Sequence, residues 1–190
     1  MDDIEILYSL LPSKIGSPLS INSLSRDLGV AYNTVKSWLG VLQRFYMLFS
    51  IPTWTSKIAR AIRKETKVYL LNYALIDDPS PRFENMVALE LLRAVSNWND
   101  LGYGSFLLHF IRNKEKREVD FLIANGRKPL LLVETKLSEK QASADLIKFQ
   151  QHLKVPAVQL TNEGEDFRIL QKEGQKILIA PAWHWLAQLP

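Results

Sequence analysis

The sequence of 190 residues contains no cysteine. This absence excludes disulfide bonds, thiolate zinc sites and a cysteine nucleophile, and it suits the reducing conditions of the cytoplasm. The sequence also lacks any apolar run of the roughly 20 residues that a membrane-spanning helix needs. The first residues, from Met1 to Glu5, are acidic where a secretory signal would be basic. We therefore expect a cytoplasmic globular protein without a targeting segment.

The basic residues are unevenly distributed along a chain whose net charge is +4. Up to Ile76 there are nine lysines and arginines against five acidic residues, and the remainder has fifteen of each. A basic N-terminal part is compatible with binding to a nucleic-acid phosphate backbone. Charge alone is equally compatible with a solvated surface of no special purpose.

A turn-rich stretch from Asp77 to Pro81 divides the sequence into two regions. The second region alternates between predicted helices and strands, which favours a mixed α/β (α+β) fold with a sheet flanked by helices. We therefore expect two domains: a winged helix-turn-helix over residues 1–76 and a mixed α/β domain over residues 82–190.

The first region has the pattern of a helix-turn-helix. A helix capped near Ser20 or Asn22 places Leu24 and Leu28 on one face. Gly29 then supplies the turn, because a left-handed conformation costs glycine nothing.

A second helix is expected from about Tyr32, with its apolar residues Val35, Leu39 and Leu42 pointing inward. Polar residues lie where base edges would be read, and the candidates for nucleic-acid contact are Asn33, Thr34, Lys36 and Ser37. Predicted strands over 45–52 and 67–71 would form the wing. Because winged helices also serve as protein-contact modules, DNA contact and protein contact both stay open.

The second region is predicted to run helix, hairpin, strand, helix and further strands. Ser138 and Gln141 have the spacing of a capping box, which would open the second of these helices. The predicted ranges are a helix over 83–98, hairpin strands over 106–112 and 118–123, a buried strand over 129–136, a helix ending near 153, strands over 156–161 and 177–180, and a closing helix over 183–189.

Charged residues continue two predicted apolar strands in this region. Side chains alternate along a strand, so Glu134 and Lys136 point to the same side, about 7 Å apart. They extend the row of Leu130 and Leu132, where burying charges is costly unless they pair, bind a metal or lie at an exposed strand end. Asp120 interrupts another apolar strand. If the two strands are adjacent and antiparallel, Asp120 and Glu134 can converge on one hard cation, for which oxygen ligands favour Mg²⁺ or Mn²⁺.

The chemistry that fits this set is phosphodiester hydrolysis. Two carboxylates would hold a cation that polarises the phosphate and lowers the pKa of a bound water. Lys136 would orient or help deprotonate that water, or stabilise the charge that develops on the phosphate. Glu84 shares a helical stripe with apolar residues and could complete the metal shell. We therefore predict Glu84, Asp120, Glu134 and Lys136 as catalytic residues, with the three carboxylates as metal ligands.

At these residues the chain resembles the PD-(D/E)xK, or restriction-endonuclease-like, nuclease superfamily. Its pattern is a helical glutamate, an aspartate on one strand and Glu-x-Lys on the next. The residues that match in order are Glu84, Asp120 and Glu134-Thr135-Lys136. The resemblance spans residues 83–160 and implies a restriction-endonuclease-like sheet in the second domain. Gln150 or Gln151 stands where some members carry a glutamine that supports the site.

A wider resemblance takes in the whole chain. It looks like the C-terminal part of a prokaryotic ATPase family in which an AAA-type ATPase domain precedes a winged helix and a domain of unknown function. The matching segments are 33–42, 67–72, 83–87, 118–121 and 133–136. The chain has Asn72 where members usually carry an aspartate, and it has no Walker-type phosphate loop, so we expect no nucleotide site. The resemblance implies an AAA-type ATPase domain or subunit as a partner.

Simpler structural roles stay open for these residues. Asp120, Glu134 and Lys136 could form a salt-bridge cluster at strand ends, and Glu84 could be a carboxylate favoured by the helix dipole. The hairpin tip formed by Lys114, Lys116 and Arg117 could bind phosphate or could be an ordinary solvent-exposed turn. The sequence therefore supports two hypotheses: a Mg²⁺- or Mn²⁺-dependent DNA nuclease targeted by a winged helix, and an inactive module that binds DNA or an ATPase partner.

Overall fold

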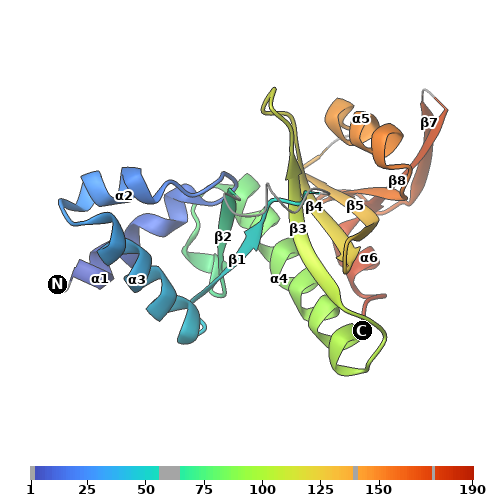
Figure 1. Ribbon diagram of the computed structural model, residues 1–190. Helices are drawn as coiled ribbons and strands as arrows, with labels where there is room; N and C mark the ends of the chain where they lie inside the picture. Colours follow the sequence, from blue (N-terminus) through green and yellow to red (C-terminus); the bar gives the residue numbers. More distant parts are fainter. Residues whose placement is uncertain (1–2, 56–64, 139–140, 173) are drawn as a thin grey trace.

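The computed structural model describes residues 3–55, 65–138, 141–172 and 174–190. Figure 1 shows a helical N-terminal part, a short two-stranded sheet and a larger sheet with helices on both faces. The mixed α/β fold class predicted from the sequence is confirmed. Among the described residues, no helix is both long enough and apolar enough to cross a membrane.

Three α-helices and a 3-10 helix form the N-terminal part. Ser20 caps the second α-helix by accepting a hydrogen bond from the Ser23 backbone N–H, and Gly29 ends this helix at φ 66°. In the third α-helix Val35 and Leu42 are buried, so its opposite side faces solvent. The four elements are α1 (Asp3–Leu10), η1 (Leu11–Lys14), α2 (Ile21–Leu28) and α3 (Tyr32–Arg44).

Two antiparallel strands follow α3. β1 (Leu48–Pro52) begins later than predicted, because the chain first turns through Tyr46 in a left-handed conformation at φ 56°. β2 (Thr66–Leu70) pairs with β1 along its whole length. Beyond β1, Thr53 forms a bridge with Phe110 of the large sheet, so the small sheet is joined to the large one. A wing in the sense of a winged helix stays a prediction for this pair.

The large sheet has six strands in the order β3-β4-β5-β6-β8-β7. The first three strands are antiparallel, β5, β6 and β8 run parallel, and β7 pairs antiparallel with β8 at the edge. The bounds are β3 (Phe106–Arg112), β4 (Glu118–Asn125), β5 (Lys128–Lys136), β6 (Ala157–Thr161), β7 (Arg168–Lys172) and β8 (Gln175–Pro181).

Helices cover both faces of this sheet (Figure 1). α4 (Pro79–Asp100) and α6 (Ala182–Leu186) lie on one face, and α5 (Ala144–Leu153) lies on the other. Because neighbouring strand residues face opposite sides, Phe121 packs in the core under α4, whereas Leu122 packs in the core under α5.

The core under α4 continues into the N-terminal part. It includes Leu7 of α1 and Val35 of α3 together with Val87 of α4 and Val133 of β5. A short 3-10 helix, η3 (Tyr73–Leu75), leads from β2 to α4. The two predicted regions are therefore packed against each other, and the domain limits of 1–76 and 82–190 stay predictions.

The capping-box prediction for the helix after β5 was wrong. α5 begins at Ala144, and Ser143 caps it by accepting a hydrogen bond from the Leu146 backbone N–H. The Gln141 carbonyl instead accepts a hydrogen bond from the Gln159 side chain on β6, at 2.9 Å. Gln141 is thus engaged with β6, and both Ser138 and Gln141 lie outside the helix.

Two other elements differ from the sequence prediction. α4 begins inside the stretch predicted as a turn, because Asp78 caps it and Pro79 tolerates the first helical position. β7 was not predicted at all. Its residues are mostly exposed, as expected for an edge strand, so it lacks the apolar alternation that identifies a half-buried strand.

Candidate functional site

Asp120 and Glu134 lie side by side where β4 and β5 pair. These strands are antiparallel with Phe121 opposite Val133, and the Asp120 backbone N–H donates to Glu134 Oε2 at 3.4 Å. Asp120 Oδ2 accepts two further hydrogen bonds from Thr135, at 2.9 Å from the backbone N–H and 2.7 Å from the hydroxyl. The structure therefore brings together two of the residues predicted to meet.

A β-bulge places Asp120. His109 pairs with Leu122 and Ile111 pairs with Val119, so two residues of β4 lie opposite Phe110 alone. An extra residue in one strand bends it and redirects the side chain. The bulge explains why Asp120 reaches Thr135 and Lys67 on the α4 side together with its neighbour Phe121, although strict alternation would place these two residues on opposite faces.

Lys136 contacts the carboxylate with which it was predicted to share a face. Its Nζ lies 3.0 Å from Glu134 Oε1, and its side chain is 39% exposed whereas that of Glu134 is 6% exposed. Burial and the nearby Asp120 carboxylate raise the pKa of Glu134 to about 8, although Lys136 opposes the shift. The ion pair therefore joins the buried carboxyl group of Glu134 to the partly exposed ammonium of Lys136.

Lys67 of β2, which the sequence analysis did not assign to the site, places a cation among the carboxylates. Its Nζ lies 3.0 Å from Glu84 Oε1, 2.6 Å from Glu118 Oε1 and 3.8 Å from Asp120 Oδ1, and its side chain is fully buried. Its Nζ also lies 5.5 Å from the centre of the Phe110 ring, within the range of a cation–π contact.

The carboxylates keep Lys67 charged. Burial lowers the pKa of Lys67, but the carboxylates of Glu84, Asp120 and Glu118 outweigh that effect and raise it above its ordinary value. A buried ammonium with fewer acidic partners would lose its proton. We call Lys67, Glu84, Glu118 and Asp120 the Lys67 cluster.

Glu84 enters this cluster from the first turns of α4. Its Oε1 accepts hydrogen bonds from Lys67 and from the Tyr69 hydroxyl, the latter at 2.7 Å. Burial and Asp120 raise the pKa of Glu84 to about 7, against the opposing effects of Lys67 and Tyr69. Burial, followed by Glu84, raises the pKa of Tyr69 well above its ordinary range, so the phenol remains a hydrogen-bond donor.

The arrangement does not fit a divalent cation as the carboxylates now stand. Across residues 3–55, 65–138, 141–172 and 174–190, no three His, Cys, Asp or Glu side chains are grouped so that they could hold a metal ion. Glu84 and Asp120 instead flank the Lys67 ammonium, at 3.0 Å and 3.8 Å from its Nζ. The described geometry is that of a buried ion-pair cluster.

The predicted nucleic-acid contacts lie on two separate surfaces, at α3 and at the β3–β4 hairpin (Figure 1). On α3, three of the four predicted side chains are exposed and the fourth is half-buried, namely Asn33, Lys36, Ser37 and Thr34. The hairpin-tip residues Lys114, Lys116 and Arg117 are all exposed. Both sets are accessible to a ligand, and neither belongs to the Lys67 cluster.

The glutamine considered as a supporting residue lies elsewhere. The Gln150 side chain is buried, and its amide donates to the Lys176 carbonyl of β8 at 2.9 Å. This contact holds α5 against β8. The structure therefore gives Gln150 a packing role on the face of the sheet opposite α4.

Sequence reasoning missed Lys67, Tyr69 and Glu118 as members of the site, although a signal was present. Strand alternation puts Lys67 and Tyr69 on one face, and Glu118 precedes Asp120 by two residues. All belong to segments that carry the wider family resemblance. What the sequence could not supply was the packing of β2 against α4 and β4, which places these segments together.

Comparison with known proteins identifies families of unknown function. The family described as a domain of unknown function (DUF4143) matches residues 81–183, more than half of the chain. Another domain of unknown function (DUF8612) matches residues 1–78. The curated proteins include no match to this sequence.

Solved structures add a distant likeness. A half-complex from a tetradecameric assembly of Thermococcus gammatolerans McrB AAA+ hexamers with bound McrC is 14% identical, with a TM-score of 0.37. The match covers 92% of this chain and 46% of that chain, so this chain spans less than half of the protein it resembles.

Proposed function

The chain belongs to the DUF4143 family, and from that premise we propose that it is a nucleic-acid-binding module that does not catalyse hydrolysis, because its nuclease-like carboxylates Glu84 and Asp120 are held in an ion-pair cluster with Lys67. The observation that carries the proposal is the fully buried ammonium of Lys67, which lies within 4 Å of Glu84, Glu118 and Asp120. We propose the cytoplasm as its compartment, which suits a chain without cysteine.

A permanent internal cation argues against catalysis by these carboxylates. Lys67 offsets one of the three carboxylate charges of the Lys67 cluster, and Arg112 lies 3.6 Å from Glu118, so the electrostatic attraction that remains for an added divalent cation is reduced. Asp120 Oδ2 is also occupied by two hydrogen bonds from Thr135. The cluster is therefore suited to holding β2, α4 and β4 together.

The exposed polar side of α3 supports DNA as the ligand. Asn33, Lys36 and Ser37 are exposed near the start of this helix, where the second helix of a helix-turn-helix presents side chains to the major groove. The net charge of +4 favours approach to a phosphate backbone. We propose duplex DNA as the ligand of this surface.

Fluorescence anisotropy of a labelled duplex of about 20 base pairs, measured between about 50 and 200 mM salt, tests the binding claim. We expect salt-sensitive binding, and Lys36→Ala should weaken it and lower the salt slope by about 1. Asp120→Asn should leave affinity unchanged, because Asp120 contacts Lys67 and Thr135 and is not part of α3.

Lys128→Ala is the matched control, because this substitution also removes one positive charge, at an exposed position at the start of β5 and away from α3. Binding without salt dependence would contradict the proposal. So would an equal loss of affinity in Lys36→Ala and Lys128→Ala, because the effect would then come from net charge alone.

A metal-dependent DNA nuclease is the second candidate. It is favoured by the contact between Asp120 and Glu134 and by the 3.0 Å approach of Lys136 Nζ to Glu134. In this candidate Asp120, Glu134 and Glu84 would hold Mg²⁺ or Mn²⁺, which would supply Lewis-acid chemistry at a phosphate. Metal binding by this set would require Glu84 and Asp120 to move away from the Lys67 ammonium. Calorimetric titration with Mn²⁺ would favour it if wild-type protein released heat and Asp120→Asn did not.

We propose an AAA-type ATPase domain or subunit as the protein partner, on the strength of the resemblance carried by the whole sequence. Phe45 and Tyr46, 74% and 79% exposed in the turn after α3, are apolar candidates for the contact. Tagged protein should retain an AAA-type ATPase from an extract of its source, and Phe45→Ser with Tyr46→Ser should lose it. Retention of the ATPase by the double variant would remove this surface from consideration.

A further inference from the structure

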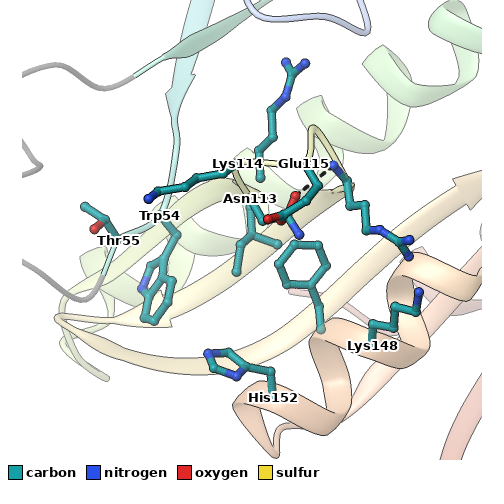
Figure 2. A pocket seen from close by; sticks show the side chains of 11 residues that line it. Trp54, Thr55, Asn113, Lys114, Glu115, Lys148 and His152 are labelled. Atoms are coloured by element: carbon teal, nitrogen blue, oxygen red, sulfur yellow. Dashed lines mark hydrogen bonds between the residues drawn. The ribbon is translucent and has the colours of Figure 1, made fainter.

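A cavity of about 510 Å³ opens between the end of β1, the tip of the β3–β4 hairpin and α5. Figure 2 shows Trp54 and His152 on one side of it, Lys148 on another, and the hairpin residues Asn113, Lys114 and Glu115 facing them. Its volume falls within the range of about 300 to 1,000 Å³ that is usual for small-molecule sites. The cavity is therefore large enough for one nucleotide.

Basic side chains predominate in the lining. Arg112, Lys114, Arg117 and Lys148 are present with one acidic residue, Glu115. Arg117 is 3.4 Å from Asp145, and Arg112 is 3.6 Å from Glu118, so both arginines have acidic partners. Among the described residues, neither Lys114 nor Lys148 forms an ion pair. Two ammonium groups at the cavity are thus available to a phosphate.

Aromatic and apolar side chains form the remainder. Ile111 and Phe149 are buried beneath the cavity, and the exposed imidazole of His152 lies on its rim. Trp54 is partly buried against the core under α5, and its backbone N–H donates to the Phe110 carbonyl at 2.7 Å, which fixes the main chain of Trp54 beside β3. A planar base can stack on a fixed aromatic ring whatever its sequence.

The hairpin tip is held in one shape. The Asn113 backbone N–H donates to the Arg117 carbonyl, and the Asn113 side chain accepts from the Arg117 backbone N–H at 2.9 Å. Lys116 adopts a left-handed conformation at φ 62°, which glycine would adopt without steric strain. A lysine at this position costs stability, and it places a further exposed cation beside the cavity.

We propose that this cavity binds one nucleotide unit of a nucleic acid, with the base against Trp54 and His152 and the phosphates on either side of that nucleotide held by Lys114 and Lys148, which lie on opposite sides of the cavity (Figure 2). The shared chemistry is a planar base joined to a phosphate, and the source that we favour is a single strand, because the cavity opens to solvent beside the exposed hairpin tip. The inference extends the proposed nucleic-acid binding to a second surface and does not depend on α3.

Anisotropy of a 5′-labelled oligothymidylate of about 15 nucleotides tests the proposal directly. Trp54→Ala should lower the affinity about ten-fold or more, whereas Trp54→Phe, which keeps an aromatic face, should retain most of it. Lys148→Ala should lower affinity and reduce the salt slope by about 1. Lys128→Ala, which removes an exposed lysine at the opposite end of the β4–β5 hairpin, should have less than about a two-fold effect.

Lys116→Gly guards against misinterpreting a loss of folding. Glycine removes the strain of the positive φ, so this variant should melt at the same or a higher temperature while binding the strand several-fold more weakly. Loss of affinity without loss of stability would support the site.

Thymidine monophosphate, used as a competitor, separates the two sources of the ligand. If it competes only at far higher concentration than the oligonucleotide, the ligand is a strand; if it binds as tightly and depends on Trp54, the ligand is a free nucleotide, and both results support the site. No binding of either probe, or equal losses in Lys148→Ala and Lys128→Ala, would overturn it. Trp54→Ala should lower oligothymidylate affinity without lowering the affinity for duplex DNA, so failure of this cavity and failure of α3 as a DNA surface remain distinguishable.

Discussion

Lys67 carries a full charge into a part of the protein that water does not reach, and three carboxylates surround it. Removing one partner from such a group is costly, because the remaining charges lose their compensation while still buried. Lys67 also accounts for the way Glu84 and Glu118, from separate elements, point to one place. At the scale of single residues, this ammonium defines the interior of the site.

Lys67→Met should destabilise the protein by about 3 to 5 kcal/mol, because methionine keeps most of the volume but leaves the carboxylates facing one another. Urea unfolding at neutral pH measures the change. Lys136→Met is the control, since Lys136 is 39% exposed and its contribution is screened by water, so it should cost less than about 1 kcal/mol. A loss below that value for Lys67→Met would contradict the role given to Lys67.

The raised pKa values of Glu84 and Glu134 predict an unusual pH dependence. In the folded protein the pKa values of Glu84 and Glu134 lie at about 7 and about 8, above the ordinary value of 4.5. Between about pH 4.5 and pH 8 the folded state therefore binds more protons than the unfolded state. Their contribution to stability is therefore present below about pH 4.5 and is lost as the pH rises through about 8.

Unfolding midpoints at intervals from pH 5 to pH 8 measure this contribution, and the difference between wild-type protein and Glu134→Gln isolates it. We expect the variant, which cannot ionise at this position, to lose less stability than wild type as the pH rises. Parallel profiles would show that Glu134 titrates as an ordinary exposed carboxylate.

Part of this chemistry could be read from the sequence. Alternation predicted that Glu134 and Lys136 share a face, and the two meet at 3.0 Å. The β-bulge at Asp120 could not be predicted, because it depends on how β3 pairs with β4. Lys67 was assigned to a different domain, and no local pattern indicates which element its strand will face.

At the scale of elements, α4 holds the two parts of the protein together. The Asn85 side chain is fully buried and forms two hydrogen bonds with the backbone of β2, as a neighbouring strand would. Its Nδ2 donates to the Leu70 carbonyl at 2.7 Å, and its Oδ1 accepts from the Leu70 N–H at 2.8 Å. Glu84, one residue earlier, joins the same helix to Lys67. The start of α4 is thus bonded to β2 by side chains.

Asn85→Leu should destabilise the protein by about 2 to 4 kcal/mol, because leucine fills the space but leaves a buried N–H and a buried carbonyl unpaired. Denaturant unfolding gives the magnitude. Asn97→Leu makes the same substitution in the same helix at a partly exposed position and should cost less than about 1 kcal/mol. Equal effects at the two positions would mean that Asn85 does not hold β2.

Elements with a clear apolar period were predicted well, and elements defined by tertiary contacts were not. The strands of the β3–β4 hairpin and the start of α3 agree with the sequence pattern. The start of α5 does not, because Gln159 of β6 holds the Gln141 carbonyl and Ser143 provides the cap. Edge strand β7 carries too little apolar surface to be recognised without its neighbour β8.

At the scale of the whole molecule, one core joins a helical part that exposes α3 to a sheet that exposes the hairpin tip (Figure 1). These two surfaces are the proposed sites of nucleic-acid binding, and the Lys67 cluster stabilises the packing of β2, α4 and β4. Mixed α/β architecture followed from the alternation of patterns in the sequence, whereas the packing of β2 on α4 required the three-dimensional structure.

The proposed function requires that the nuclease-like residues do not cleave DNA. The measurement is incubation of pure wild-type protein and Lys136→Ala with duplex and single-stranded DNA in the presence of Mn²⁺, followed by electrophoresis of the products, with DNA binding verified on the same preparations. We predict that both proteins bind DNA and that neither cleaves it above the level of buffer alone. Mn²⁺-dependent cleavage by the wild type that disappears in Lys136→Ala would contradict the account and establish the catalytic role of Lys136.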